Sequence, residues 1–196
     1  MARSNGPDPT ESDTPTAFVL AVETLRSARL RPEVVVEQTP APKRLAPYAF
    51  ALTADVAGDA ASGRLVLLHD PVGQEAWHGE FRVVIYVRAA LEPEMAADPL
   101  LLGVGWTWLT DALVGRAAPY AAASGTVTRV SSESFGVMAQ EPATAEIEIR
   151  ASWTPLDADL APHALAWGDV LTTAAGLAPL PPGVVAIPPP RGGTAR

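Results

Sequence analysis

The feature that most constrains this chain is an alternation of apolar and polar residues in two segments, 81–91 ("FRVVIYVRAAL") and 144–153 ("TAEIEIRASW"). In each segment one set of alternate residues is apolar, whereas the other set is largely polar or charged. Successive side chains of a strand point to opposite faces, so the pattern predicts two strands with one buried and one solvated face. The polar face carries Arg82, Arg88, Glu146, Glu148 and Arg150.

Further strands follow from the same period or from flanking turn residues. They cover residues 48–56, 64–70 and 125–136. The turn "DAASG" at 59–63 joins the first two as a hairpin, since aspartate and glycine favour tight turns. Residues 33–37 remain open between strand and loop, because three valines favour an edge strand while nearby prolines limit its pairing.

Three segments have the residue spacing of helices. They cover residues 14–29, 94–116 and 160–177. In the last of them one stripe is apolar, and Gly176 stands where a helix stop is expected. The stripe consists of Leu160, Ala164, Trp167, Leu171 and Ala174.

The order of these elements predicts the fold class. The predicted order is a helix, three strands, a helix, two strands and a helix. This order does not show the regular alternation of strands and helices that a doubly wound sheet requires. Strands with one polar face, joined by short turns, form an antiparallel sheet that helices cover on one side. We therefore predict an α+β, two-layer fold with an antiparallel sheet of about five strands and helices mainly on one face.

Length and composition favour one folded domain. The chain has 196 residues, of which 48% are apolar and 18% charged, so a single hydrophobic core is expected. Proline, glycine and polar residues are frequent at both ends of the chain. We expect one domain over residues 14–179, a disordered N-terminus over 1–13 and a disordered tail over 180–196.

Cysteine content and charge exclude several classes of function. The absence of cysteine excludes disulfides, thiolate catalysis, iron–sulfur clusters and cysteine-based zinc sites. The formal net charge of −8 disfavours binding to the nucleic-acid backbone. The sequence shows neither a signal peptide nor a run of about 20 apolar residues that would span a bilayer. We expect a cytoplasmic protein that binds neither nucleic acid nor membrane and that needs no cofactor or metal.

The segment 103–116 ("GVGWTWLTDALVGR") places two tryptophans behind a Gly-x-Gly pair. A dinucleotide-binding loop would need glycine at position 108, where Trp108 stands instead, so this function is excluded. If the segment is helical, one apolar stripe has the composition of a core face. This stripe consists of Leu100, Leu101, Val104, Trp108 and Ala112.

The same helix has a second apolar stripe, formed by Trp106, Leu109 and Leu113. A helix that is apolar on two sides buries both of them, either within its own chain or against a partner. Two residues turn a helix by about 200°, so we expect Trp108 to face the sheet and Trp106 to face away from it.

Two polar regions are candidates for chemistry. His69 and His78 lie among carboxylates near a predicted hairpin, but no compact metal-binding spacing is present, so polar turn residues are the favoured interpretation. On the polar sheet face, Glu146 and Glu148 have a spacing that would suit an acid and a base. The arginines predicted on the same face favour cross-strand ion pairs on a solvated surface instead.

Five local sequences carry a family resemblance. They are "PAPKRLAPYAFAL", "GQEAWHGEFRVV", "LEPEMAADPLLLGVGWTWLTDAL", "GTVTRVSSESFG" and "AEIEIRASWTP". Together they resemble an uncharacterised actinobacterial family, a domain of unknown function, and the resemblance implies no catalytic residue. The order of elements is also similar to that of type III secretion chaperone-like domains, which are two-layer, dimeric protein-binding modules.

These observations lead to two hypotheses for the function. The first, which we favour, is a non-catalytic interaction or adaptor module that binds a protein partner, or itself as a homodimer, through Trp106, Leu109 and Leu113. The second is a small-ligand-binding protein or an enzyme that uses the polar sheet face and the hairpin from His69 to His78. The first predicts an uncovered apolar patch on the middle helix, and the second predicts a concave pocket on the polar face.

Overall fold

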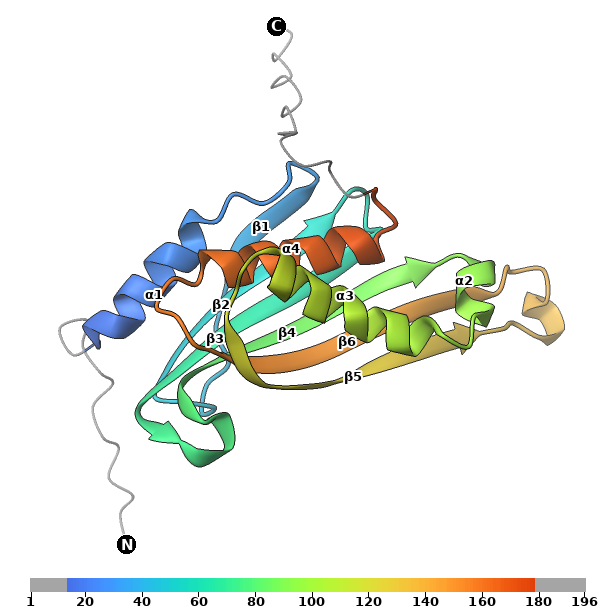
Figure 1. The fold of residues 1–196 in the computed structure, drawn as a ribbon. Coiled ribbons are helices and arrows are strands. Elements are labelled where there is room, and N and C mark those ends of the chain that lie inside the picture. The colour runs from blue at the N-terminus through green and yellow to red at the C-terminus, as the bar shows by residue number, and fades with distance from the viewer. Residues whose placement is uncertain (1–13, 179–196) are drawn as a thin grey trace, which may run out of the picture.

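The computed structural model describes residues 14–178 and shows a sheet with helices packed on one face (Figure 1). Six strands lie in the order β1-β2-β3-β4-β6-β5, and all neighbouring pairs are antiparallel. The strands are β1 (Val34–Thr39), β2 (Tyr48–Val56), β3 (Ala61–Gln74), β4 (Gly79–Leu91), β5 (Tyr120–Ser132) and β6 (Thr144–Pro155). The helices are α1 (Thr16–Ser27), α2 (Pro93–Ala97), α3 (Leu101–Gly115) and α4 (Ala161–Ala174), with 3-10 turns η2 (Glu75–Trp77) and η3 (Gly136–Met138).

The predicted α+β class, with an antiparallel sheet and helices mainly on one face, is confirmed. The sheet has one strand more than predicted, because the segment that the sequence left open forms β1. This strand pairs with β2 from Val34 opposite Val56 to Thr39 opposite Ala51, and the neighbouring prolines lie outside it. The chain ends that were expected to be disordered, residues 1–13 and 180–196, lie outside the described residues.

The single helix expected over residues 94–116 is divided into α2 and α3. Asp98 has an extended conformation (φ −68°, ψ 121°), because the ring of the following Pro99 disfavours a helical conformation at the residue before it. The Leu100 amide donates a hydrogen bond to Asp98 Oδ1 at 2.8 Å, so this aspartate also satisfies a free amide at the start of α3.

The apolar faces of the strands meet beneath the helices. Val83, Ile85 and Val87 of β4 are at most 1% exposed, and Ile149 lies opposite Val87 on β6. Helix α4 packs over β3 and β4 and lies between α1 and α3 (Figure 1), so most of its side chains are buried. Its predicted stripe is confirmed, since all five residues are buried. Gly176 stops the helix in the left-handed conformation (φ 73°), as expected.

The opposite face of the sheet is covered in part. A small second cluster of Ala51, Val66 and Leu68 is packed against Trp77 of η2 and against alanines of the β1–β2 connection. This cover lies over β2 and β3, so the polar residues of β4 and β6 occupy the remainder of the face.

The predicted orientation of α3 is wrong. Leu109 and Leu113, expected to face away from the sheet, are 0% exposed, whereas Val104, expected in the core, is 42% exposed. The buried side is completed by Leu101 and Gly105. A Cβ at Gly105 would lie 3.0 Å from side-chain atoms of both β5 and β6, so the helix approaches the sheet through this glycine. Because glycine contributes no apolar side chain, a count of apolar residues selects the wrong face.

The two tryptophans of α3 flank its buried side. Trp106 lies over β5, where a Cβ at Gly125 would be 2.9 Å from the indole. Trp108 lies on the other flank and lines a cleft between α3 and α4. Both side chains are half-buried, and the fully buried tryptophans are Trp153 and Trp167. The prediction that one indole faces the sheet and the other faces away is therefore wrong. The two indoles lie on opposite sides of the buried face of α3.

A buried histidine connects α4 to β6. Trp153 Nε1 donates a hydrogen bond to His163 Nδ1 at 3.0 Å, and both side chains are 0% exposed. Since Nδ1 accepts this bond, the neutral ring holds its proton on Nε2. Burial lowers the pKa of His163 from 6.5 to about 4, against the opposing charges of Asp157 and Asp159. The ring is therefore uncharged at neutral pH.

We predict opposite effects of alanine at the two glycines of α3. The methyl group of Gly103→Ala meets nothing within 4 Å, so the free energy of unfolding should rise by about 0.5–1 kcal/mol through the higher helix propensity of alanine. Gly105→Ala must displace Ile147 and Val127, so we expect a net loss of about 1–2 kcal/mol. Urea denaturation measures both, and equal stabilisation would contradict the assigned buried face.

We also predict that acid weakens the fold through His163. Between about pH 6.5 and pH 4 the imidazole takes up a proton in the unfolded chain but not in the folded one. The unfolded state binds more protons in this window, so the free energy of unfolding should fall by roughly 3 kcal/mol as the pH drops through it. His163→Asn keeps an acceptor for Trp153 without titrating, and its stability should change less over the same window. If the free energy of unfolding of the wild type and of His163→Asn, measured by urea denaturation, changes equally with pH, this role of His163 is disproved.

Candidate functional site

The predicted polar sheet face consists of paired charges. Arg88 donates to both carboxylate oxygens of Glu146, at 2.9 and 2.5 Å, and Arg150 donates to Glu148 at 2.9 Å. The arginine side chains are 51% and 64% exposed, so these pairs lie in solvent. The pair of Arg88 and Glu146 joins β4 to β6, whereas Arg150 and Glu148 are neighbours on the same face of β6. Exposed ion pairs of this kind contribute little to stability.

Tyr86 belongs to the same network. Its hydroxyl donates a hydrogen bond to Glu148 Oε1 at 2.9 Å, and the guanidinium of Arg150 lies 5.4 Å above its ring. Burial and the charge of Glu148 raise the pKa of Tyr86, so the phenol remains a donor. Both oxygens of Glu148 are therefore engaged, which leaves this carboxylate poorly suited to proton transfer.

Arg82 differs from the other arginines of this face because it is only 7% exposed. It donates to the hydroxyls of Ser124, Ser152 and Thr154 at 3.2, 2.8 and 3.1 Å, and none of the ion pairs among residues 14–178 includes it. Burial lowers the pKa of its guanidinium. The hydroxyl of Thr154 in turn donates to the Trp77 carbonyl. Arg82 thus joins β4, β5 and β6, which is a structural role.

The two histidines of the β3–β4 hairpin lie in different environments. His69 is 1% exposed and stacks on Phe81, with ring centroids 4.2 Å apart. His78 ends η2 in the left-handed conformation, with φ 57°. In the described part of the chain, no group of three or more histidine, aspartate or glutamate side chains is arranged to hold a metal ion. His69 therefore serves aromatic packing.

Strand β5 is a long open edge of the sheet (Figure 1). It has 13 residues, most of them exposed, and pairs with β6 on one side, with a bulge between Ala121 and Ser124. Residues 120–128 include no charged side chain. The opposite edge strand, β1, has only 6 residues and lies between Pro32 and Pro40. Since charges, prolines and short length protect an edge against further pairing, β5 is the less protected edge.

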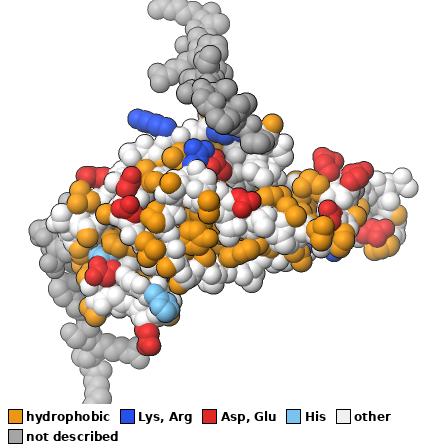
Figure 2. Space-filling model, viewed as in Figure 1, with side chains coloured by type: hydrophobic (Ala, Val, Ile, Leu, Met, Phe, Trp, Pro, Cys, Tyr) orange, Lys and Arg blue, Asp and Glu red, His pale blue; other side chains and the backbone are white. Residues whose placement is uncertain are grey.

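Exposed apolar side chains accompany this edge. Leu102, Val104 and Val114 of α3 are 43%, 42% and 72% exposed. Figure 2 shows hydrophobic side chains along the face that carries α3 and at the end formed by α2 and the β5–β6 connection. Those of β5 and this connection are Val130, Phe135, Val137 and Met138. Of the three residues predicted as a contact surface, Leu109 and Leu113 are in the core, and Trp106 alone remains partly accessible.

At the other side of the helix layer, a cleft of about 430 Å³ lies between α1, β1 and α4. Its rim includes three arginines, Arg26, Arg29 and Arg31. Its apolar walls include Leu25, Val34, Val36, Leu52, Ala164 and Trp167. We call this the arginine cleft.

Residues 14–185 match the model of a family described as "Protein of unknown function (DUF3000)". The chain belongs to the DUF3000 family. The match confirms the resemblance to a domain family of unknown function and includes every described element from α1 to α4. No curated protein and no solved structure matches the chain. Between residues 14 and 178 of this DUF3000 protein, no helix is long and apolar enough to cross a bilayer.

Sequence analysis of the DUF3000 chain missed the arginine cleft. The only signal is the segment "RSARLR" (26–31), which concentrates three arginines in a chain with 14 basic and 22 acidic residues. The segment covers the last two residues of α1 and the loop that follows, and nothing in the linear pattern shows that β1 and α4 complete a cavity beside it.

Proposed function

We propose that this protein is a non-catalytic interaction module that assembles as a homodimer through the open edge of β5. The observation that supports the proposal is a 13-residue edge strand, most of it exposed, with an uncharged stretch from 120 to 128. Backbone amide and carbonyl groups on the outer side of such a strand are free to pair with another strand. Strand addition would thus extend the sheet without any change in the fold.

A second copy of this chain is the partner that the edge suits best. A two-fold interface brings each strand against itself, so like charges along the strand would repel. Residues 124–128 are Ser, Gly, Thr, Val and Thr, which avoids this repulsion. Antiparallel pairing of two such strands would join the two sheets into one.

The neighbouring helix adds apolar area to this interface. Trp106 lies over β5, and Leu102 and Val114 of the same helix are exposed. Strand pairing would bring the α3 helices of the two copies toward the symmetry axis and remove part of this surface from water. The area matters because stable dimers bury about 1,200–2,000 Å² in total.

A further consideration supports an interaction module. The order of elements that the sequence predicts is similar to that of chaperone-like domains that bind proteins as dimers. A location in the cytoplasm, where an adaptor would meet its partner, is part of this proposal.

The alternative hypothesis, an enzyme on the polar sheet face, has less support. Glu146 and Glu148 are held by Arg88, Arg150 and Tyr86, whereas a catalytic carboxylate is expected in a desolvating cleft. The arginine cleft and the cleft beside Trp108 are lined by other residues.

Charge on the β5 edge should convert the dimer into a monomer. We expect this of the double variant Thr128→Lys with Val130→Lys, because it places two like charges on each edge. Within one chain these positions lie opposite Glu148 and Glu146, so the fold should tolerate the lysines. Val35→Lys, on the opposite edge strand at 60% exposure, is the matched control and should remain dimeric. Analytical ultracentrifugation from low to high micromolar concentration measures the change.

Two results would contradict the proposal. One is a wild-type protein that sediments as a monomer at every concentration. The other is a dimer that the lysines on β5 leave intact but that Val35→Lys dissociates, which would move the interface to β1.

A further inference from the structure

The arginine cleft combines three positive side chains with an apolar interior. Arg26, Arg29 and Arg31 belong to its lining, which includes no aspartate or glutamate. The chain as a whole has a net charge of −8, so this concentration of positive charge runs against the average. Of the three, only Arg31 forms an ion pair among the described residues, with Glu33. Two guanidinium charges at the rim are therefore not neutralised by an ion pair.

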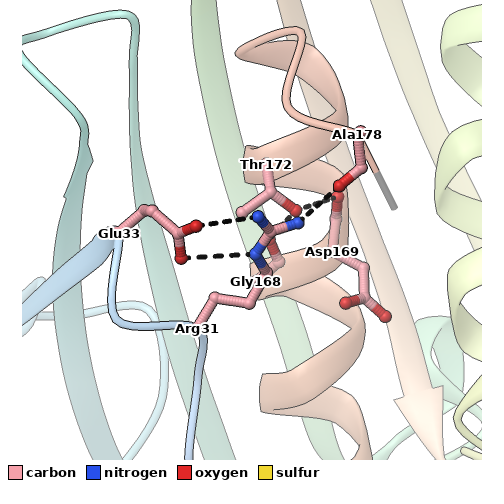
Figure 3. Close-up of polar contacts among 6 residues, drawn as sticks. All are labelled: Arg31, Glu33, Gly168, Asp169, Thr172 and Ala178. Atoms are coloured by element: carbon pink, nitrogen blue, oxygen red, sulfur yellow. Dashed lines mark hydrogen bonds and ion pairs between the residues drawn. The ribbon is translucent and has the colours of Figure 1, made fainter. Parts of the chain in front are cut away.

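The rim of the cleft is held in place by the rest of the fold (Figure 3). Arg31 lies between Glu33 and α4, with Nη2 donating to Glu33 Oε1 at 2.9 Å and Nη1 donating to the Ala178 carbonyl at 2.8 Å. The hydrogen bond from Arg31 lowers the pKa of Glu33, so this carboxylate remains charged. Leu30 packs on Gly168, where a Cβ would lie 2.8 Å from the leucine side chain. Leu30 and Arg31 thus anchor the loop directly after Arg29.

Arg26 is also held in place by its neighbours, although no carboxylate of the described residues forms an ion pair with it. Its Nη2 donates to the side-chain oxygen of Gln38 on β1, and its guanidinium lies 4.8 Å above the ring of Phe50. An amide oxygen and an aromatic face stabilise a guanidinium but leave its charge in place. The side chain therefore extends across the cleft opening between α1 and β1 with a full positive charge.

The interior of the cleft is apolar and belongs to the core. Trp167 and Ala164 of α4 are at most 1% exposed, and Leu25, Leu52 and Val34 are at most 8% exposed. A cleft of about 430 Å³ falls within the range of about 300–1,000 Å³ that is usual for small-molecule sites. Its walls suit a hydrocarbon or aromatic group, and its rim suits an anion.

We propose that the arginine cleft binds a small amphipathic carboxylate, with the carboxylate at Arg29 and Arg26 and the apolar part against Trp167. A planar carboxylate accepts two parallel hydrogen bonds from one guanidinium, which makes arginine the preferred partner for this group. Residues 179–196, at the end of the sequence, carry Arg191 and Arg196 and no acidic side chain, so charge disfavours that segment as the occupant. This site is separate from the β5 edge and does not depend on dimer formation.

The proposal is tested with three probes and the full-length protein. Octanoate has both the anion and the apolar chain, acetate has the anion alone, and 1-octanol has the chain alone. Isothermal titration calorimetry should give octanoate an affinity at least about tenfold higher than either fragment, because only octanoate uses rim and interior together. Amide chemical shifts in NMR spectra should change for residues 29–31 and 33–36 on addition of octanoate.

Variants locate the site. Arg29→Gln removes an exposed charge and should weaken octanoate binding by about fivefold to tenfold. Lys43→Gln removes the same charge from the β1–β2 connection, which covers the opposite face of the sheet, and should bind octanoate like the wild type. Val36→Phe fills the cleft from β1 and should abolish binding, with a thermal melt to verify folding. If this variant does not fold, the comparison of the two charge variants still decides the question.

Three outcomes would overturn the proposal. The first is the absence of octanoate binding at millimolar concentration. The second is equal binding of 1-octanol and octanoate, which would show an apolar cavity that does not select an anion. The third is unchanged octanoate affinity in Arg29→Gln.

Discussion

The structure depends on the close approach of the helix layer to the sheet, which glycines permit at specific points. A Cβ at Gly63 of β3 would lie 2.8 Å from a methyl group of Leu171 on α4, and one at Gly125 of β5 would lie 2.9 Å from the indole of Trp106 on α3. On the helix side, Gly105 meets β5 and β6 in the same manner. Because packed interiors tolerate neither overlap nor voids, these contacts determine which side of each helix faces the sheet.

The packing of the helices on the sheet determines which surfaces remain accessible to a partner or a ligand. Helix α4 lies at the centre, so most of its side chains are buried, whereas α1 and α3 lie at the margins of the layer (Figure 1). Beyond α3 the sheet ends in the open edge of β5, and beside α1 the layer leaves the arginine cleft. The two candidate surfaces are therefore separate consequences of one packing arrangement. An interaction at the edge and a ligand in the cleft would occupy different parts of the molecule.

On the polar sheet face, the sequence predicts which residues share the face but not which of them are buried. The alternation in β4 and β6 places Arg88, Glu146, Glu148 and Arg150 on one face. Pairing of the two strands brings Arg88 to Glu146, and Arg150 contacts Glu148 on the same strand. Arg82 belongs to the same pattern but is buried, because its guanidinium is bonded to hydroxyl groups of β5 and β6, and one of these, Thr154, is bonded to Trp77 of η2. Burial of a single side chain depends on segments distant in the chain, which periodicity does not describe.

The sequence by itself determined the class of the fold, most strand positions and the buried stripe of α4, because alternation and helical spacing are local properties of the chain. Only the tertiary structure decided the orientation of α3. That helix is apolar on nearly every side, so its composition has no preferred direction, and a glycine that packs against two strands sets it. The same holds for the arginine cleft. Its rim comes from a short segment, 26–31, but its walls come from β1, β2 and α4, which are remote in sequence and become neighbours only when the sheet forms.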